Sequence, residues 1–129
     1  MKPLNVLPVP CSSCPYRLDT PAGVWHPDEY EKLREYDDNS SLATFLCHQS
    51  FEIGKDTVCR GWLSVHCESV AARLAVMRGD VTAEQLYAEV QVALYATGNQ
   101  AADAGMRGVK RPSKQARKVI RRLSKRRKT

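Results

Sequence analysis

The stretch Leu63–Arg78 reads LSVHCESVAARLAVMR, and its apolar residues recur at alternating steps of four and three. This spacing predicts one amphipathic helix that turns a continuous apolar stripe toward a core. The stripe consists of Leu63, Cys67, Val70, Leu74 and Met77. Gly79 follows, at a position where helices commonly end. We therefore expect a helix over about residues 63–78 to organise the fold.

Shorter helix signals flank this stretch. Pro27 suits the first position of a helix whose apolar face would consist of Tyr30, Leu33 and Tyr36. Thr82–Gln85 fits a capping box that opens a helix ending near Gly98, and the Ala-rich segment Asn99–Met106 predicts one or two further turns. The first 25 residues contain five prolines and are expected to form a loop. The sequence thus predicts a mainly α fold with a loop-rich N-terminal half.

Charge divides the chain into two unequal parts. The last 23 residues, 107–129, hold 12 of the 20 Lys and Arg residues and no Asp or Glu. Residues 1–106 hold eight basic and 14 acidic residues, a formal net charge of −6. We interpret this asymmetry as a cysteine-rich domain, 1–106, followed by a basic tail, 107–129, that binds a polyanion.

The basic tail is predicted to bind nucleic acid through phosphate contacts, with DNA favoured over RNA. A helix beyond Pro112 would place Ala116, Val119, Ile120 and Leu123 on one face, ready to dock on the body or on a partner. The tail has no aromatic residue, which disfavours stacking on single-stranded bases. An anionic membrane, the acidic helix at residues 28–35 and a purely solubilising role are the alternatives. The predicted contact residues are Arg107, Lys110, Arg111, Lys114, Arg117, Lys118, Arg121, Arg122, Lys125, Arg126, Arg127 and Lys128.

The five cysteines favour metal binding over disulfides. No apolar stretch resembles a signal peptide or a membrane span, so we expect a reducing cytoplasm, where disulfides are disfavoured. Five is also an odd number, which a closed disulfide framework would not explain. The body of the chain is small, and a bound metal would help it fold.

The proposed ligands are the four cysteines outside the 63–78 stripe. Cys11 and Cys14 form a Cys-x-x-Cys knuckle, whose spacing lets two thiolates bind one metal centre. Cys47 and Cys59 follow in separate motifs, and Cys59 lies just ahead of an expected helix, where the helix dipole would lower its thiol pKa. Pro15 directly after Cys14 is a pairing that recurs in iron–sulfur proteins. We favour an iron–sulfur cluster, expected to be [4Fe–4S], over Zn²⁺.

Three further residues are reserve ligands. Cys67 belongs to the apolar stripe and is expected in the core. His48 adjoins Cys47, and adjacent side chains diverge, so His48 is expected to donate a hydrogen bond behind the metal site. His66 is near Cys59 in sequence and stays in reserve.

A catalytic reading is the competing interpretation of the knuckle. Cys-x-x-Cys also serves as a redox dithiol, but that chemistry usually lies between a strand and a helix of a βαβ unit. Prolines flank this knuckle and no such unit follows. The sequence contains no motif for binding a small-molecule substrate or for catalysis, so we favour a protein that is not an enzyme.

The motifs resemble those of a group of small uncharacterised proteins from actinobacteria and their phages. The matching residues are Cys11-x-x-Cys14-Pro15-Tyr16-Arg17, Phe45-Leu46-Cys47-His48-Gln49, Cys59-Arg60-Gly61-Trp62 and Ala72-Arg73-Leu74. This resemblance covers about residues 10–80 and implies a phage-borne protein whose shared cysteines are Cys11, Cys14, Cys47 and Cys59. It implies no activity.

The overall design is also similar to the WhiB-like transcription factors, which pair a four-cysteine iron–sulfur cluster with a Gly-Val-Trp turn and a basic C-terminal segment. Here Gly23-Val24-Trp25 precedes two of the cysteines, and the spacings differ. The similarity implies work in transcription. We therefore expect a small metal-stapled helical regulator that binds nucleic acid, or a protein-interaction module that contacts host RNA polymerase components.

Overall fold

The structure, a computed structural model, describes residues 4–47 and 55–127, and the side chains of the last helix only as far as residue 124. Its elements are β1 (Asn5–Val6), α1 (Pro27–Asp37), β2 (Thr57–Val58), α3 (Arg60–Val65), α4 (Val70–Met77), α5 (Ala83–Leu86), α6 (Gly98–Met106) and α7 (Lys114–Arg127). The prediction of a mainly α fold is confirmed. No helix in this described part is long and apolar enough to cross a membrane.

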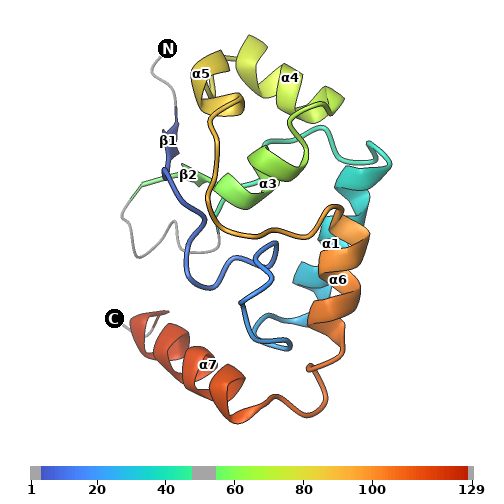
Figure 1. Ribbon diagram of the computed structural model, residues 1–129, viewed down its shortest axis with the longest axis vertical. Coiled ribbons are helices and arrows are strands. Elements are labelled where there is room, and N and C mark those ends of the chain that lie inside the picture. The colour runs from blue at the N-terminus through green and yellow to red at the C-terminus, as the bar shows by residue number, and fades with distance from the viewer. Residues whose placement is uncertain (1–3, 48–54, 128–129) are drawn as a thin grey trace.

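The helices surround an N-terminal loop that runs through the middle of the molecule. Helices α4 and α5 lie at one end, α7 lies at the opposite end, and α1 and α6 run side by side between them (Figure 1). The central loop contributes Cys14 and Tyr16 to the core, where they meet Trp62 and Leu63 of α3. The cysteine-bearing loop is therefore at the centre of the fold.

Helix α1 forms as the sequence predicts. Its apolar face, Tyr30, Leu33 and Tyr36, is buried. The imidazole Nδ1 of His26 accepts a hydrogen bond from the Asp28 N–H at 3.1 Å and caps the helix. At the other end, Asp37 accepts hydrogen bonds from the N–H groups of Gly98 and Asn99 at 2.8 and 2.7 Å. One carboxylate thus ties the end of α1 to the start of α6.

The single helix predicted over residues 63–78 is wrong, because the structure forms two. Helix α3 begins at Arg60 and ends at Val65, and α4 begins only at Val70. The Ser69 hydroxyl accepts a hydrogen bond from the Ala72 N–H at 3.1 Å and so starts the second helix. A serine that caps a new helix offers the backbone an alternative to continuing the old one.

The predicted apolar stripe is wrong within α4. This helix buries its alanine face, Ala71, Ala72 and Ala75. Val70 is 42% exposed and Met77 is 81% exposed, although both belong to the predicted stripe. Alanines let the helix backbone approach the body closely, and the larger apolar side chains are left outside.

Helix α5 opens with the predicted capping box of Thr82 and Gln85 but ends at Leu86, well short of Gly98. The chain beyond it is extended because it pairs with the central loop. The Tyr95 N–H donates to the Tyr16 carbonyl at 2.8 Å, and the Leu18 N–H donates to the Ala93 carbonyl at 3.1 Å. Tertiary backbone pairing has replaced the second half of a predicted helix, whereas α6 forms where it was expected.

Candidate functional site

Backbone pairing brings Cys47 beside Cys59. Strand β2 pairs in parallel with β1, and a further antiparallel bridge joins Leu46 to Val58. The Cys47 N–H donates to the Thr57 carbonyl at 2.6 Å, and the Cys59 N–H donates to the Phe45 carbonyl at 2.8 Å. Two cysteines that are 12 positions apart in sequence therefore lie on neighbouring extended segments.

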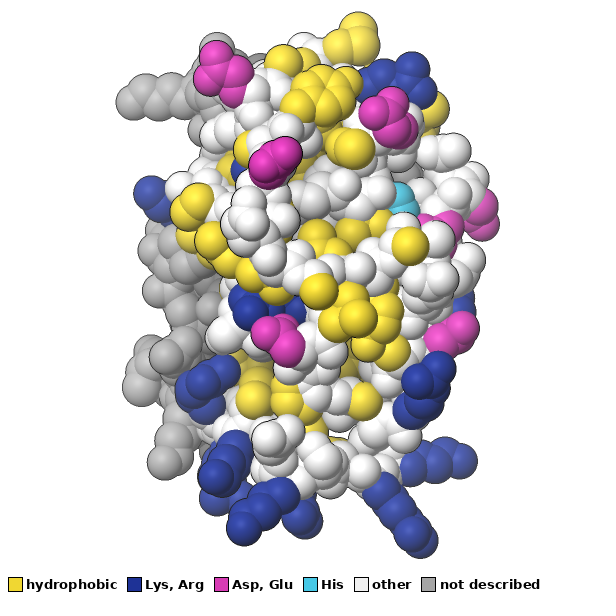
Figure 2. All heavy atoms as spheres, viewed as in Figure 1, with side chains coloured by type: hydrophobic (Ala, Val, Ile, Leu, Met, Phe, Trp, Pro, Cys, Tyr) yellow, Lys and Arg dark blue, Asp and Glu magenta, His cyan; other side chains and the backbone are white. Residues whose placement is uncertain are grey.

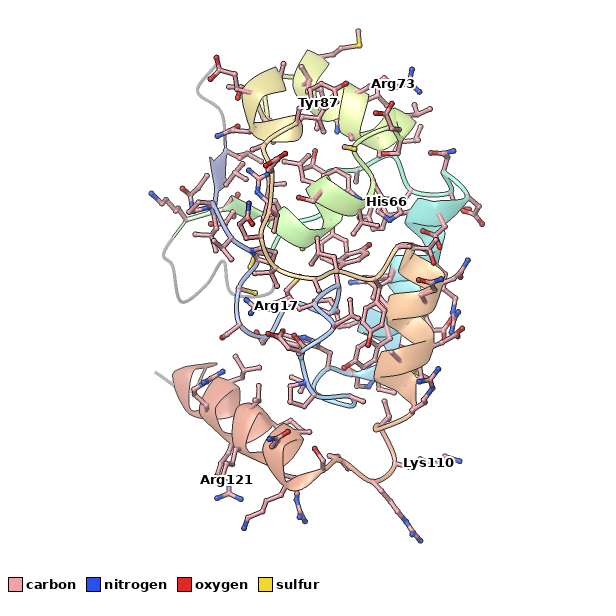
Figure 3. The ribbon with its side chains drawn as sticks, in the orientation of Figure 1. Arg17, His66, Arg73, Tyr87, Lys110 and Arg121 are labelled. Atoms are coloured by element: carbon pink, nitrogen blue, oxygen red, sulfur yellow. The ribbon has the colours of Figure 1, made fainter. Side chains whose placement is uncertain are left out.

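The Cys11–Cys14 knuckle is a turn held on several sides. The Cys14 N–H donates to the Cys11 carbonyl at 3.0 Å and closes the turn. The indole N–H of Trp25 donates to the Ser13 carbonyl at 2.8 Å. The Arg17 guanidinium, labelled near the middle of Figure 3, donates to the Pro10 carbonyl at 2.9 Å. These bonds fix the knuckle against the core.

The four predicted ligand cysteines meet as two sulfur pairs. The Cys47 thiol donates to Cys11 with 3.6 Å between the sulfurs, and the sulfurs of Cys14 and Cys59 are 3.9 Å apart. All five cysteines are free thiols, since a disulfide bond would hold sulfurs about 2.05 Å apart. Each knuckle cysteine thus faces a cysteine from a different motif.

Gly61 lets Cys14 come this close. A β-carbon at position 61 would lie 2.5 Å from the Cys14 sulfur and 3.0 Å from the Tyr16 β-carbon. No side chain fits there without moving the knuckle. The glycine of the Cys-x-Gly-Trp motif is therefore a packing requirement of the sulfur pair.

Cys11 is the cysteine most easily deprotonated among those with a shifted pKa. The hydrogen bond from Cys47 is the main cause that lowers the pKa of Cys11 to about 7, and the Ser13 hydrogen bonds and the Arg17 charge lower it further, against the opposing effect of burial. Cys11 is also half-buried, whereas Cys14, Cys47 and Cys59 are buried. These contacts prepare the Cys11 thiol for the thiolate form.

The thiol pKa of Cys59 is raised, whereas the sequence predicts that it is lowered. Cys59 does cap α3, and its sulfur accepts a hydrogen bond from the Trp62 N–H at 3.4 Å. However, the hydrogen bond with Cys14 and the burial of Cys59 raise the pKa of its thiol well above the ordinary value, and the negative charge on Cys14 and Cys11 raises it further. The helix terminus acts in the predicted direction but is outweighed.

The reserve ligands have other roles or lie outside the described residues. Cys67 is half-buried against the core, in agreement with the core role expected for it. His66 is buried at the end of α3, with its Nε2 3.4 Å from Asp37 and its ring edge-on to Tyr16. Burial lowers the pKa of His66. His48 lies outside the described residues.

The distance between the two sulfurs of each pair fits two thiolates bound to the same metal atom. Two thiolates bound at about 2.3 Å to one tetrahedral zinc lie about 3.8 Å apart. The observed 3.6 and 3.9 Å lie on either side of this value. Within residues 4–47 and 55–127, no three Cys, His, Asp or Glu side chains form a group that would hold a metal ion, so the pairs stay separate.

The predicted basic helix forms and docks on the body. In α7, Ala116 and Leu123 are buried, while Val119 and Ile120 are half-buried. Ile120 and Leu123 face Val24 and Trp25 across a cavity of about 120 Å³. This is the apolar face that the sequence predicts, and its partner is the segment just before α1.

A close backbone contact anchors the link between α6 and α7. Gly23, with φ of +82°, lies against Gly108, and a β-carbon on Gly23 would be 2.2 Å from the Gly108 carbonyl oxygen. A β-carbon on Gly108 would likewise be 2.5 Å from the Ala22 carbonyl oxygen. Two glycines at this crossing let the segment after α6 lie directly against the loop before α1.

The described cations of the basic segment all point to solvent. They are Arg107, Lys110, Arg111, Lys114, Arg117, Lys118, Arg121 and Arg122. None of these eight has an ion-pair partner within the part of the chain that the structure describes. Their blue surface gathers at the α7 end of the molecule (Figure 2). The side chains of the remaining predicted residues, Lys125, Arg126, Arg127 and Lys128, are outside the description.

Residues 6–127 match a protein family described as a family of unknown function (DUF6283). The chain belongs to this family. The match spans the knuckle, the core helices and α7, so both candidate regions lie within it. Neither a curated protein nor a solved structure matches the chain.

Sequence reasoning did not assign Trp25 a structural role. Trp25 is buried, donates to the knuckle through its indole and contributes to the surface that receives α7. An isolated tryptophan in a Pro- and Gly-rich loop was the available signal, because burying so large a side chain in a loop needs a specific partner.

Proposed function

We propose that this chain is a metal-stapled nucleic-acid-binding protein that works in the reducing cytoplasm. Cys11, Cys14, Cys47 and Cys59 would hold the metal, either an iron–sulfur cluster or zinc. The basic surface of α7 and the segment before it would bind nucleic acid, with DNA favoured over RNA. The eight described cations of this surface, which are exposed and have no ion-pair partner among the described residues, support this function most directly.

The two sulfur pairs support the metal half of the proposal. The hydrogen bond with Cys14 and burial are the main causes of the raised pKa of Cys59, and the negative charge of the neighbouring thiolates adds to them. A cation among four thiolates would remove that repulsion. A [2Fe–2S] cluster takes two thiolates on each iron, which matches one pair per iron. Zinc would need both pairs to close on one ion, and a [4Fe–4S] cluster would need each sulfur on its own iron.

Metal analysis with an absorption spectrum, on protein purified without oxygen, tests this half. We expect metal at a fixed ratio to protein, with visible absorption and sulfide if it is iron or a colourless protein if it is zinc. Cys14→Ser and Cys59→Ser should each lose the metal. The matched control is Cys67→Ser, which should keep it. A protein that carries no metal after anaerobic purification and reconstitution with either ion would contradict the proposal.

The charge of α7 supports the nucleic-acid half, because Lys and Arg release counterions from phosphates when they bind. Changing Lys114, Arg117, Lys118 and Arg121 to Gln in the full chain should abolish most binding to a labelled oligonucleotide. The remaining affinity should depend less on salt. The control replaces Arg73 and Arg78, two cations at the opposite end, with Gln. Equal losses in both variants would count against the α7 surface.

The outward face of α4 favours a second candidate, a module that contacts a protein such as host RNA polymerase. Val70 and Met77 project from α4, and Tyr87 beside it is 62% exposed. Figure 3 shows Tyr87 and Arg73 together at this end. Capture of polymerase that survives nuclease treatment, and that is lost in Val70→Ser/Met77→Ser, would support this candidate over nucleic-acid binding.

A further inference from the structure

The position of α7 on the body affects which form of nucleic acid its cations can bind. We propose that the body holds α7 as a fixed helix so that the basic surface selects double-stranded over single-stranded nucleic acid. This inference rests on the proposed nucleic-acid function and adds the form of the partner and the residues that select it. Ile120 and Leu123 act here as positioning residues.

The first step is that α7 has one orientation on the body. Ala116 and Leu123 of its apolar face belong to the same buried cluster as Val24 and Trp25, and Ile120 and Leu123 line a small cavity with those two residues. The Gly23–Gly108 crossing holds the start of the segment that joins α6 to α7. Ser113 caps the helix, since its hydroxyl accepts a hydrogen bond from the Ala116 N–H at 3.1 Å.

The second step is that this orientation turns the cations outward as a row. Lys114, Arg117, Lys118, Arg121 and Arg122 recur every three or four residues, so they share the side of the helix opposite the docked face. Arg121 on α7 and Lys110 in the preceding segment both point away from the body at the same end of the molecule (Figure 3). From Lys114 to Arg122 this row is about 12 Å long.

The third step compares this row with the two forms of nucleic acid. A duplex is stiff and carries one phosphate charge per about 1.7 Å of axis. When a fixed row of cations binds it, neither the protein nor the duplex loses much conformational entropy. A single strand must first order itself against the helix, and it usually recovers that free energy by stacking bases on aromatic rings. Helix α7 has no aromatic residue, so a single strand gains no such stacking.

The docked face also counts against an anionic membrane as the partner. A membrane-bound amphipathic helix inserts its apolar face among the lipids. In this structure Ala116 and Leu123 of that face are buried against the body, so α7 would have to leave the body before the whole face could insert.

The test measures binding of the full-length protein to a labelled random-sequence DNA duplex of about 20 base pairs and to one of its strands, at several salt concentrations. Vesicles with an anionic phospholipid are the third probe. We expect the duplex to bind about tenfold more tightly than the strand and the vesicles to bind weakly. Equal binding of duplex and strand would overturn this inference and leave the nucleic-acid proposal standing. No binding of either, or binding of vesicles alone, would overturn both.

A variant that keeps every cation isolates the docking. In Ile120→Ala/Leu123→Ala the row loses its anchor, so the duplex affinity should fall about tenfold while the single-strand affinity changes less than about twofold. Arg121→Gln provides a second measurement that needs no change in docking. It should weaken duplex binding and lower the salt slope by about one. Equal losses for duplex and strand in the double alanine variant would show that docking does not select the duplex.

Discussion

The cysteine region and helix α7 carry the two proposed activities, but the fold holds them in different ways. The four candidate ligand cysteines lie on three chain segments that are tied together by backbone hydrogen bonds, and Cys14, Cys47 and Cys59 are buried. Helix α7 is attached through one apolar face and a short link, and the rest of its surface is exposed.

This difference shows how charge and burial divide the molecule. In the cysteine region the knuckle is held by close contacts, such as Gly61 against Cys14 and Trp25 against Ser13. The basic helix needs solvent for its cations, so only its alanine and aliphatic side can be buried. We therefore expect damage at the cysteines to affect the whole fold and damage at α7 to remain local.

Metal removal should have the largest effect. If the thiols hold a metal, a strong chelator removes folding free energy of several kcal/mol and should lower the unfolding temperature by more than about 15 °C. Deleting residues 113–129 should lower it by only a few degrees. Thermal unfolding followed by circular dichroism checks both. If deleting residues 113–129 lowered the unfolding temperature more than the chelator did, α7 and not the metal site would contribute more to the stability of the fold.

Gly61→Ala should come next, because it changes the packing of the sulfur pair without removing a thiol. The added β-carbon would meet the Cys14 sulfur, and forced overpacking of a core typically costs about 1–3 kcal/mol. Denaturant unfolding gives the loss. Met77→Ala is the control, since that side chain is 81% exposed and should change stability by less than about 0.5 kcal/mol.

Leu123→Ala should produce a smaller and local effect. Removing this buried side chain weakens the docking of α7, so amide hydrogen exchange within residues 114–127 should quicken by about tenfold or more. Exchange in α1 and α6 should stay unchanged, because those helices pack against each other. Faster exchange throughout the chain would mean that α7 is an integral part of the core.

The smallest effect should be a pH dependence from His66. Burial lowers its pKa in the folded chain, while the unfolded chain has the ordinary value of about 6.5. The unfolded state then binds the proton more readily, so this contribution to stability is full above about pH 6.5 and is lost as the pH falls toward the lowered pKa.

His66→Gln should therefore lose less stability than the native chain between pH 7.5 and pH 5.5. Asp37, near Nε2, opposes the effect of burial, and Tyr16 and Tyr36 pack against the ring. His26→Gln is the control at an exposed position. Urea midpoints at the two pH values check the prediction, and parallel losses in the native chain and His66→Gln would contradict it.

Local signals gave the reliable part of the sequence analysis. Pro27 and the Thr82–Gln85 capping box start helices where they were expected, because both act within one helical turn. The apolar side of α7 was also identified correctly, since charge left only one face that a body could bury. The pairing of Cys11 with Cys47 and of Cys14 with Cys59 could not be read in the same way, because it joins separate motifs.

By itself, the sequence determined the helical class and the separation of basic and acidic charge. These properties follow from composition, spacing and single-turn chemistry. Only the tertiary structure decided that α4 buries its alanines, that α5 stops at Leu86 and that α7 docks beside Trp25. Each of these outcomes depends on which distant part of the chain packs against the segment. The spacing of residues within one segment does not predict that packing.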